Sequence, residues 1–388
     1  RHIVMEVSMK LPWLKSAFTP AGEFISVHLD TTRTDPNAAA ELTARWNQFR
    51  NRLAADGAPT DILDEIEEAV LSPSPIGGRH GRTIIATPKE IILDRVLPVP
   101  PREAVSFGPQ PMLLPLVQAV PYAVSQLLIE VDRAGADLHL RAPENPKIDA
   151  ADADKVDGGH DELHKASAGG GSRHGWRARE FNARVEDSWE RNAEAVARKV
   201  DALVLEHKPD MVLITGDVRA TSLLRDALGQ DAAERVQVLS GGTRGVSMER
   251  AAFRKELQAA TAAFIEHRQK SVAESFLEGQ QRAGATVGGG SEVASTLQRG
   301  QVEDLVLVVG QEPDNVEELI RAAIETDAGV HALEPESASI PDGVGAFLRW
   351  RDGATPSDGL ASMSGDKRRE GAGSAKSPHE LEEEALRA

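Results

Sequence analysis

The first hundred residues show the hydrophobic pattern of a sheet covered by helices. Residues 23–31 (EFISVHLDT) alternate between apolar and polar, which is typical of a strand with one buried face. Leu42, Trp46 and Leu53 recur at helical spacing in a segment that starts near Pro36. The pattern further predicts a helix over 59–72, two strands around Pro88 over 81–100, and irregular structure over the proline-rich residues 98–121.

The next stretch alternates strands with helices. Residues 125–141 predict two strands that turn at 133–135, and residues 177–207 carry an apolar stripe at helical spacing. A short apolar strand over 209–217 and a helix over 218–228 follow, so this part is α/β in character. A long helix is then predicted over 248–284.

The last third repeats this alternation on a smaller scale. The pattern predicts a glycine turn, a helix and an apolar strand over 285–310, then a helix over 315–326 and a strand over 330–335. Glycine, serine and charge dominate from about residue 351, where we expect little order. We therefore predict an α/β (α+β) multidomain protein with layered domains at 1–120, 121–270 and 271–352, and a tail over 353–388.

Composition narrows the class of protein. The chain has 388 residues, 40% of them hydrophobic, and no apolar run approaches the roughly 20 residues of a membrane span. It contains no cysteine, which excludes disulfides and thiolate metal sites. The first residues lack the pattern of a secretion signal, so we expect a cytoplasmic location. The formal charge of -17 argues against a surface coated with nucleic acid but leaves room for local contacts.

A basic, glycine-rich stretch interrupts this acidic chain. Five lysines or arginines and one acid lie between residues 163 and 184, directly after the acidic segment 149–162. Glycine permits close backbone approach to RNA, cations neutralise phosphate, and aromatic rings stack on bases. The alternative is an ordinary flexible surface loop. The candidate RNA-binding residues are Lys165, Gly169, Gly170, Gly171, Ser172, Arg173, His174, Trp176, Arg177 and Arg179.

A second, smaller basic set lies in the first segment, where the alternative is charged surface. Its candidates for RNA contact, together with the turn between the two helices predicted there, are Arg45, Arg50, Arg52, Asp56, Gly57, Arg79, His80 and Arg82.

Other candidate sites fit their motifs poorly. Asp152, Asp154 and Asp157 do not match a calcium loop, because Val156 stands at the fifth position. Asp132 and Asp217 end apolar strands, and we expect turn and helix-cap roles for them rather than metal binding. The glycines of 169–175 match no phosphate-binding motif, and the turn 240–245 (SGGTRG) is explained equally by anion binding and by a strand-to-helix connection. We therefore expect no metal or cofactor.

Three segments together resemble a known superfamily. Residues 125–140 and 164–189 look like the opening strands, the catalytic-centre loop and the long helix of the middle domain of archaeal and eukaryotic class-1 release factors and Pelota. Residues 287–308 look like the signature of the C-terminal domain in the same proteins. The bacterial branch of this superfamily, which includes the hibernation factor Balon, is the most similar.

The resemblance implies a function, and two departures refine it. Release factors carry Gly-Gly-Gln in the loop, whereas here Ser172 follows Gly171 and no glutamine occurs over 165–198. The stop-codon-reading Asn-Ile-Lys-Ser is also missing, since the turn over 55–60 reads ADGAPT. The resemblance therefore implies a non-catalytic factor that occupies the vacant aminoacyl-tRNA (A) site, spans decoding and peptidyl-transferase centres, and protects idle ribosomes during stress.

The resemblance also names partners: the 70S ribosome with its 16S and 23S rRNA and ribosomal proteins, and EF-Tu or a related GTPase, but neither membrane nor DNA. Three alternatives remain: a peptidyl-tRNA hydrolase or rescue release factor, a Pelota-like factor that recognises stalled ribosomes, and, more distantly, an unrelated metal nuclease.

Overall fold

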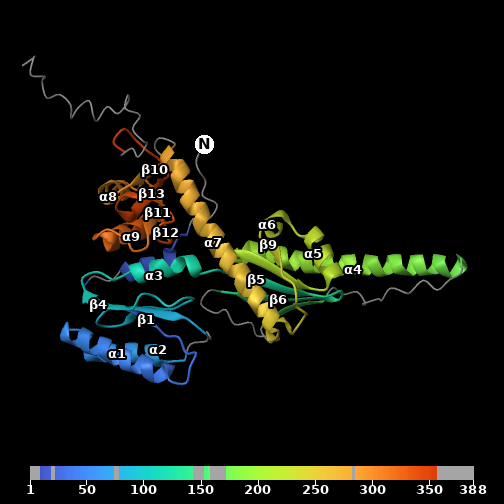
Figure 1. Cartoon of the computed structure of the whole chain (residues 1–388), viewed down its shortest axis with the longest axis horizontal. Helices are drawn as coiled ribbons and strands as arrows, with labels where there is room; N and C mark the ends of the chain where they lie inside the picture. The colour runs from blue at the N-terminus through green and yellow to red at the C-terminus, as the bar shows by residue number, and fades with distance from the viewer. Residues whose placement is uncertain are drawn as a thin grey trace, which may run out of the picture. The chain divides into compact units, whose positions relative to one another are not determined.

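The computed structural model describes residues 9–18, 22–73, 78–142, 153–157, 172–281 and 285–355. Its described part is a mixed α/β protein with three separate sheets, as the pattern predicted (Figure 1). The chain divides into two compact units, Ser16–Gln269 and Arg1–Lys15 with Lys270–Ala388. No helix in the described part is long and apolar enough to cross a bilayer.

The N-terminal sheet has the strand order β3-β2-β1-β4 with antiparallel neighbours. One face carries Ile25, Val27 and Leu29, which pack against α1 and α2 as alternation in a strand requires. The proline-rich stretch is not irregular, because it contains β4 and α3. The elements are β1 (Phe24–Asp30), α1 (Ala38–Ala55), α2 (Thr60–Leu71), β2 (Gly81–Ala86), β3 (Ile91–Leu97), β4 (Ala104–Gly108), α3 (Leu114–Ala119) and the short helix η2 (Val120–Tyr122).

The middle sheet has the order β7-β6-β5-β8-β9, with β5 antiparallel to β6 and parallel to β8. Leu127 and Ile129 face α4, α5 and α6, while Leu128 faces α7 across the other side. The elements are β5 (Gln126–Val131), β6 (Gly135–Arg141), β7 (Asp154–Asp157), α4 (Ser172–His207), β8 (Met211–Gly216), α5 (Val218–Ala227), α6 (Gln230–Ala233), β9 (Val236–Val238), η3 (Ser247–Glu249) and α7 (Ala251–Gln281).

Two expectations about this sheet were wrong in detail. Part of the acidic segment forms a strand that was not predicted, β7, which pairs with β6 and is largely exposed. Helix α4 begins at Ser172, before the predicted start at 177.

The C-terminal sheet has the order β10-β13-β11-β12, and only β11 and β12 run parallel. The predicted helix and strand order is confirmed, but β10 and β13 were not predicted. Residues 9–15 group with this unit rather than with the predicted N-terminal domain, and Val330 N donates to Met9 O at 3.1 Å. The elements are η1 (Pro12–Phe18), β10 (Thr286–Gly288), α8 (Gly290–Gln298), β11 (Val302–Val308), α9 (Val316–Glu325), β12 (Gly329–Leu333), η4 (Pro341–Gly343) and β13 (Val344–Leu348).

Candidate functional site

The N-terminal part of α4 extends beyond the sheet that the rest of the helix covers (Figure 1). The side chains of α4 are described from Glu186 onward, and the buried ones among them include Trp189, Ala193, Val196 and Val200. We call residues 172–185 the α4 extension; at about 1.5 Å per residue it is about 20 Å long. The helix thus presents its first turns away from the domain core.

Arg133 anchors the base of the α4 extension. Its guanidinium lies 4.4 Å from the centre of the Trp189 ring and 3.2 Å from Asp217 Oδ2. The Arg133 carbonyl accepts a 2.8 Å hydrogen bond from Asn192 Nδ2, one turn further along α4. We call Arg133, Trp189, Asn192 and Asp217 the anchor cluster. It joins the β5–β6 turn to α4 and to the start of α5.

Asp217 has a second role in this cluster as the N-cap of α5. Its Oδ1 accepts hydrogen bonds of 3.0 Å from both Arg219 N and Ala220 N. Partial burial acts to raise the pKa of Asp217, but hydrogen bonds from Ala220 and Arg133 outweigh it and the pKa is lowered. The carboxylate therefore stays charged, as its pairing with Arg133 requires.

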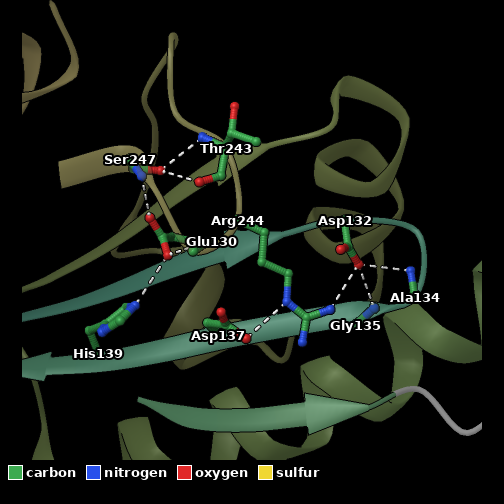
Figure 2. Close-up of polar contacts among 10 residues, drawn as sticks. Glu130, Asp132, Ala134, Gly135, Asp137, His139, Thr243, Arg244 and Ser247 are labelled. Carbon is green, nitrogen blue, oxygen red and sulfur yellow. Dashed lines mark hydrogen bonds and ion pairs between the residues drawn. The ribbon is translucent and has the colours of Figure 1, made fainter. Parts of the chain in front are cut away.

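A second set of polar contacts fixes the loop before α7 to the β5–β6 hairpin (Figure 2). Arg244 donates from Nε to Asp137 Oδ1 at 2.9 Å and from Nη1 to Asp132 Oδ1 at 3.0 Å. Glu130 accepts from Gly245 N at 3.0 Å. We call Glu130, Asp132, Asp137, His139 and Arg244 the hairpin cluster.

Glu130 is a buried carboxylate held in its charged form. Besides the amide of Gly245 it contacts Ser247 N at 3.1 Å and His139 Nε2 at 3.3 Å. Burial acts to raise the pKa of Glu130, but the hydrogen bonds from His139, Ser247 and Gly245 together lower it. The turn 240–245 is therefore a strand-to-helix connection tied down by protein groups.

The expected turn and helix-cap roles of Asp132 and Asp217 are confirmed. Asp132 Oδ1 accepts from Ala134 N and Gly135 N, each at 2.9 Å, and so forms the hairpin turn. Asp217 is a cap, and Trp189 is 4% exposed within the core. Among the described residues, no group of three or more His, Asp or Glu side chains is placed to hold a metal ion.

The structure describes only some of the predicted RNA-binding residues of the glycine-rich stretch. Lys165 and Gly169 to Gly171 lie outside the described residues. The remainder lie in the first turns of α4 rather than in a loop: Ser172, Arg173, His174, Trp176, Arg177 and Arg179.

In the second basic set, three arginines already pair with carboxylates. Arg45 lies 3.2 Å from Glu103, Arg50 contacts Asp64 and Glu67 at 2.6 and 2.9 Å, and Arg82 contacts both oxygens of Asp94 at 2.6 Å. His80 is buried, with its Nδ1 2.9 Å from Gly78 O. Four members remain exposed, two of them cationic: Arg52, Asp56, Gly57 and Arg79.

Sequence reasoning missed Arg133 and Arg244, which organise the two clusters. Both lie in turns rich in glycine or small residues, where the sequence alone suggests an exposed arginine without a structural role. Their partners, Asp217 and Asp137, lie on other elements, so the pairing follows only from the fold.

A comparison with protein families matches the part of the chain that contains the middle sheet. Residues 125–282 match the model of the bacterial archaeo-eukaryotic release factor family 2. An uncharacterized protein of Mycobacterium tuberculosis (strain H37Rv) is 28% identical over 306 residues, covering 77% of this chain and 78% of that protein.

Among solved structures, Archaeoglobus fulgidus Pelota is 12% identical, with a TM-score of 0.34 and coverage of 89% and 94% of the two chains. A chain from a model of ribosome-bound archaeal Pelota and ABCE1 is 14% identical, with a TM-score of 0.38 and coverage of 90% and 99%. The overall superpositions are poor at these scores. The match over residues 125–282 shows that this part of the chain is similar to the bacterial branch of the archaeo-eukaryotic release factors.

Proposed function

We propose that this protein is a non-catalytic ribosome-binding factor that occupies the vacant A site of idle ribosomes. The α4 extension and the glycine-rich residues before it reach toward the peptidyl-transferase centre, and the N-terminal domain lies at the decoding centre. The C-terminal domain docks EF-Tu or a related GTPase. Occupation of the site blocks tRNA entry and protects the particle.

One observation carries this proposal: the part of the basic stretch from Ser172 onward lies on a helix whose first turns, about 20 Å long, extend beyond the sheet of the middle domain. Arg173, Arg177 and Arg179 are placed in its first turns, where cations pair with RNA phosphates. The anchor cluster fixes the direction of the projection. Such an extension suits a narrow RNA-walled channel better than an open surface.

We infer the absence of catalysis from the sequence around the start of α4. Hydrolysis of peptidyl-tRNA by release factors resembling this chain uses the glutamine of Gly-Gly-Gln to position water. Here Ser172 follows the glycines, and a serine side chain is too short to replace that amide.

The test is co-sedimentation of the purified chain with 70S ribosomes, with and without EF-Tu. We expect the triple variant R173A/H174A/R177A to pellet less and to show a weaker dependence on salt, because fewer phosphate contacts release fewer counterions. The matched control R191A/R198A removes two exposed arginines from the body of the same helix and should pellet like the wild type. Equal pelleting of both variants would refute the role of the extension.

A second assay separates the proposal from its rivals. Stalled ribosome–nascent chain complexes incubated with the protein should keep their peptide and remain intact. Steady peptide release would instead identify a rescue release factor, and accumulation of free subunits would identify a Pelota-like recruiter of splitting machinery.

A further inference from the structure

A cavity of about 500 Å³ lies in the unit Ser16–Gln269, at the end of the middle sheet. One wall is a single face of α7, where Arg254, Gln258, Thr261 and Ile265 recur at helical spacing. The other walls come from the ends of β5 and β6 and from neighbouring loops. Cavities of about 300–1,000 Å³ are the size of small-molecule sites.

The charge of the lining is opposite to that of the chain. Arg79, Arg141 and Arg254 line the cavity, and among the described residues no aspartate or glutamate does so. A smaller cavity of about 360 Å³ shares Arg79 and Tyr122, adds Arg102, and likewise has no described acid in its lining. In a chain with 61 acidic and 44 basic residues, this gathering of guanidinium groups requires an explanation.

The remaining lining is apolar with a few hydrogen-bonding groups. Val124 and Leu257 are buried, and Ile265 and Tyr122 are partly buried beside them. Thr261 Oγ1 accepts a 2.7 Å hydrogen bond from Gln126 Nε2, and the side-chain oxygen Oε1 of Gln126 accepts one from Arg141 Nη1. This chain of contacts orients Arg141 at the cavity wall.

We propose that this cavity binds a nucleoside phosphate, with its phosphates on Arg141 and Arg254 and its base against Val124, Leu257 and Ile265. Several guanidinium groups match the multiple charges of a di- or triphosphate better than the single charge of a carboxylate. A planar base fits the apolar wall, and Gln258 and Tyr122 supply groups for its polar edge. Burial lowers the pKa of Arg141 to about 10, and a bound anion would offset this loss of hydration.

This site shares Arg79 with the second basic set but contains no residue of the α4 extension, and its test needs no ribosome. Isothermal titration calorimetry on the purified full chain would compare adenosine and guanosine 5′-diphosphate with the free nucleosides and with inorganic pyrophosphate. We expect at least one nucleoside diphosphate to bind, and the nucleoside and pyrophosphate to bind about tenfold more weakly or worse, because each supplies half of the contacts.

Two variants at exposed positions of α7 test the location without disturbing the core. Arg254→Gln removes a charge and should weaken binding about tenfold. Ala262→Trp fills the cavity and should abolish binding. Arg225→Gln, at an exposed arginine on α5, is the matched control and should bind like the wild type.

Three results would overturn the proposal. They are no heat of binding for either diphosphate at about 1 mM, pyrophosphate that binds as tightly as the diphosphates, or wild-type affinity in both α7 variants.

Discussion

His28 shows how a single buried group sets a pH limit on the N-terminal sheet. Its ring is fully buried, with Nε2 2.9 Å from Met112 O and Nδ1 2.9 Å from Thr83 Oγ1. A carbonyl oxygen only accepts, so Nε2 carries the proton and Nδ1 accepts from the threonine hydroxyl. Burial lowers the pKa of His28 from 6.5 to about 4, against a smaller opposing effect of the Met112 carbonyl.

This lowered pKa predicts an acid-sensitive domain. Above pH 6.5 His28 is neutral in both states; as the pH falls toward 4, the unfolded state binds a proton that the folded state refuses. The free energy of unfolding should fall by about 3 kcal/mol over that interval, at about 1.4 kcal/mol per pH unit. Hydrogen exchange of peptides from β1 and β2, followed as a function of pH, measures this loss of stability. His28→Gln should remove this part of the pH dependence, and an unchanged slope would contradict the assignment.

Removing the negative charge of Glu130 without changing the size of its side chain should lower the free energy of unfolding. Glu130→Gln keeps the size of the side chain but turns one of its acceptors into an NH₂ group that faces a backbone donor. We expect a loss of about 1–3 kcal/mol in the free energy of unfolding, the usual cost of an unsatisfied buried polar group. Urea unfolding at neutral pH measures the loss, with Glu249→Gln, an exposed glutamate, as control. Equal stability of the two variants would show that the hydrogen bonds to Glu130 contribute nothing.

At this scale the sequence identifies residue types but not partners. It marked Arg45, Arg50 and Arg82 as cations available to RNA, and each is paired with an acid from another element. Asp132 and Asp217 were assigned correctly, because turn and cap contacts are local in sequence. Pairings across the fold, such as Arg244 with Asp137, require the sheet to bring residues together.

At the scale of elements, α4 combines a longer part that packs on the middle sheet with the shorter α4 extension. Its apolar stripe was clear in the sequence, whereas its start was hidden by Gly175 and by the glycines before it. The strands β4 and β7 were missed because proline and acidic residues outweigh short strand patterns, and β13 because glycine interrupts its apolar run. Pairing with established neighbours, rather than propensity, makes these segments strands.

The contacts of the anchor cluster predict that Arg133 fixes the orientation of the α4 extension. Arg133→Ala should cost about 1 kcal/mol in stability, since the ion pair is partly exposed and the ring contact is modest. Ribosome binding should weaken by more than this, because α4 loses its fixed direction. Arg133→Lys keeps a charge near Asp217 and should restore part of the affinity. Pelleting with ribosomes measures the loss of affinity, and thermal unfolding measures the loss of stability. If the loss of binding free energy is no greater than the loss of stability, Arg133 does not orient α4.

At the scale of the whole molecule, residues 9–15 belong to the C-terminal unit although they lie far from it in the sequence. Leu11 and Leu14 are buried there, and Lys15 lies 2.6 Å from Asp327. No periodicity linked residues 9–15 to a sheet that forms more than 250 positions later, so only the fold reveals the contact.

The contacts of residues 9–15 predict that this segment stabilises β12. Leu14→Ala removes a fully buried side chain and should destabilise the C-terminal unit by about 2–5 kcal/mol. Hydrogen exchange of β12 peptides should accelerate, while β1 peptides stay unchanged. Lys15→Ala, which removes an exposed ion pair, serves as the control and should have little effect. Unchanged exchange in β12 would show that the segment adds no stability.

The most direct test of the ribosome-binding proposal uses the cysteine-free sequence, in which one introduced cysteine accepts a tethered iron probe that cleaves nearby RNA. Ser172→Cys marks the start of α4, Asp56→Cys the turn between α1 and α2, and Asp226→Cys an exposed control on α5. The account predicts cleavage of 23S rRNA at the peptidyl-transferase centre from position 172 and of 16S rRNA at the decoding centre from position 56. Cleavage from position 172 elsewhere on the ribosome, or none at all, would contradict it.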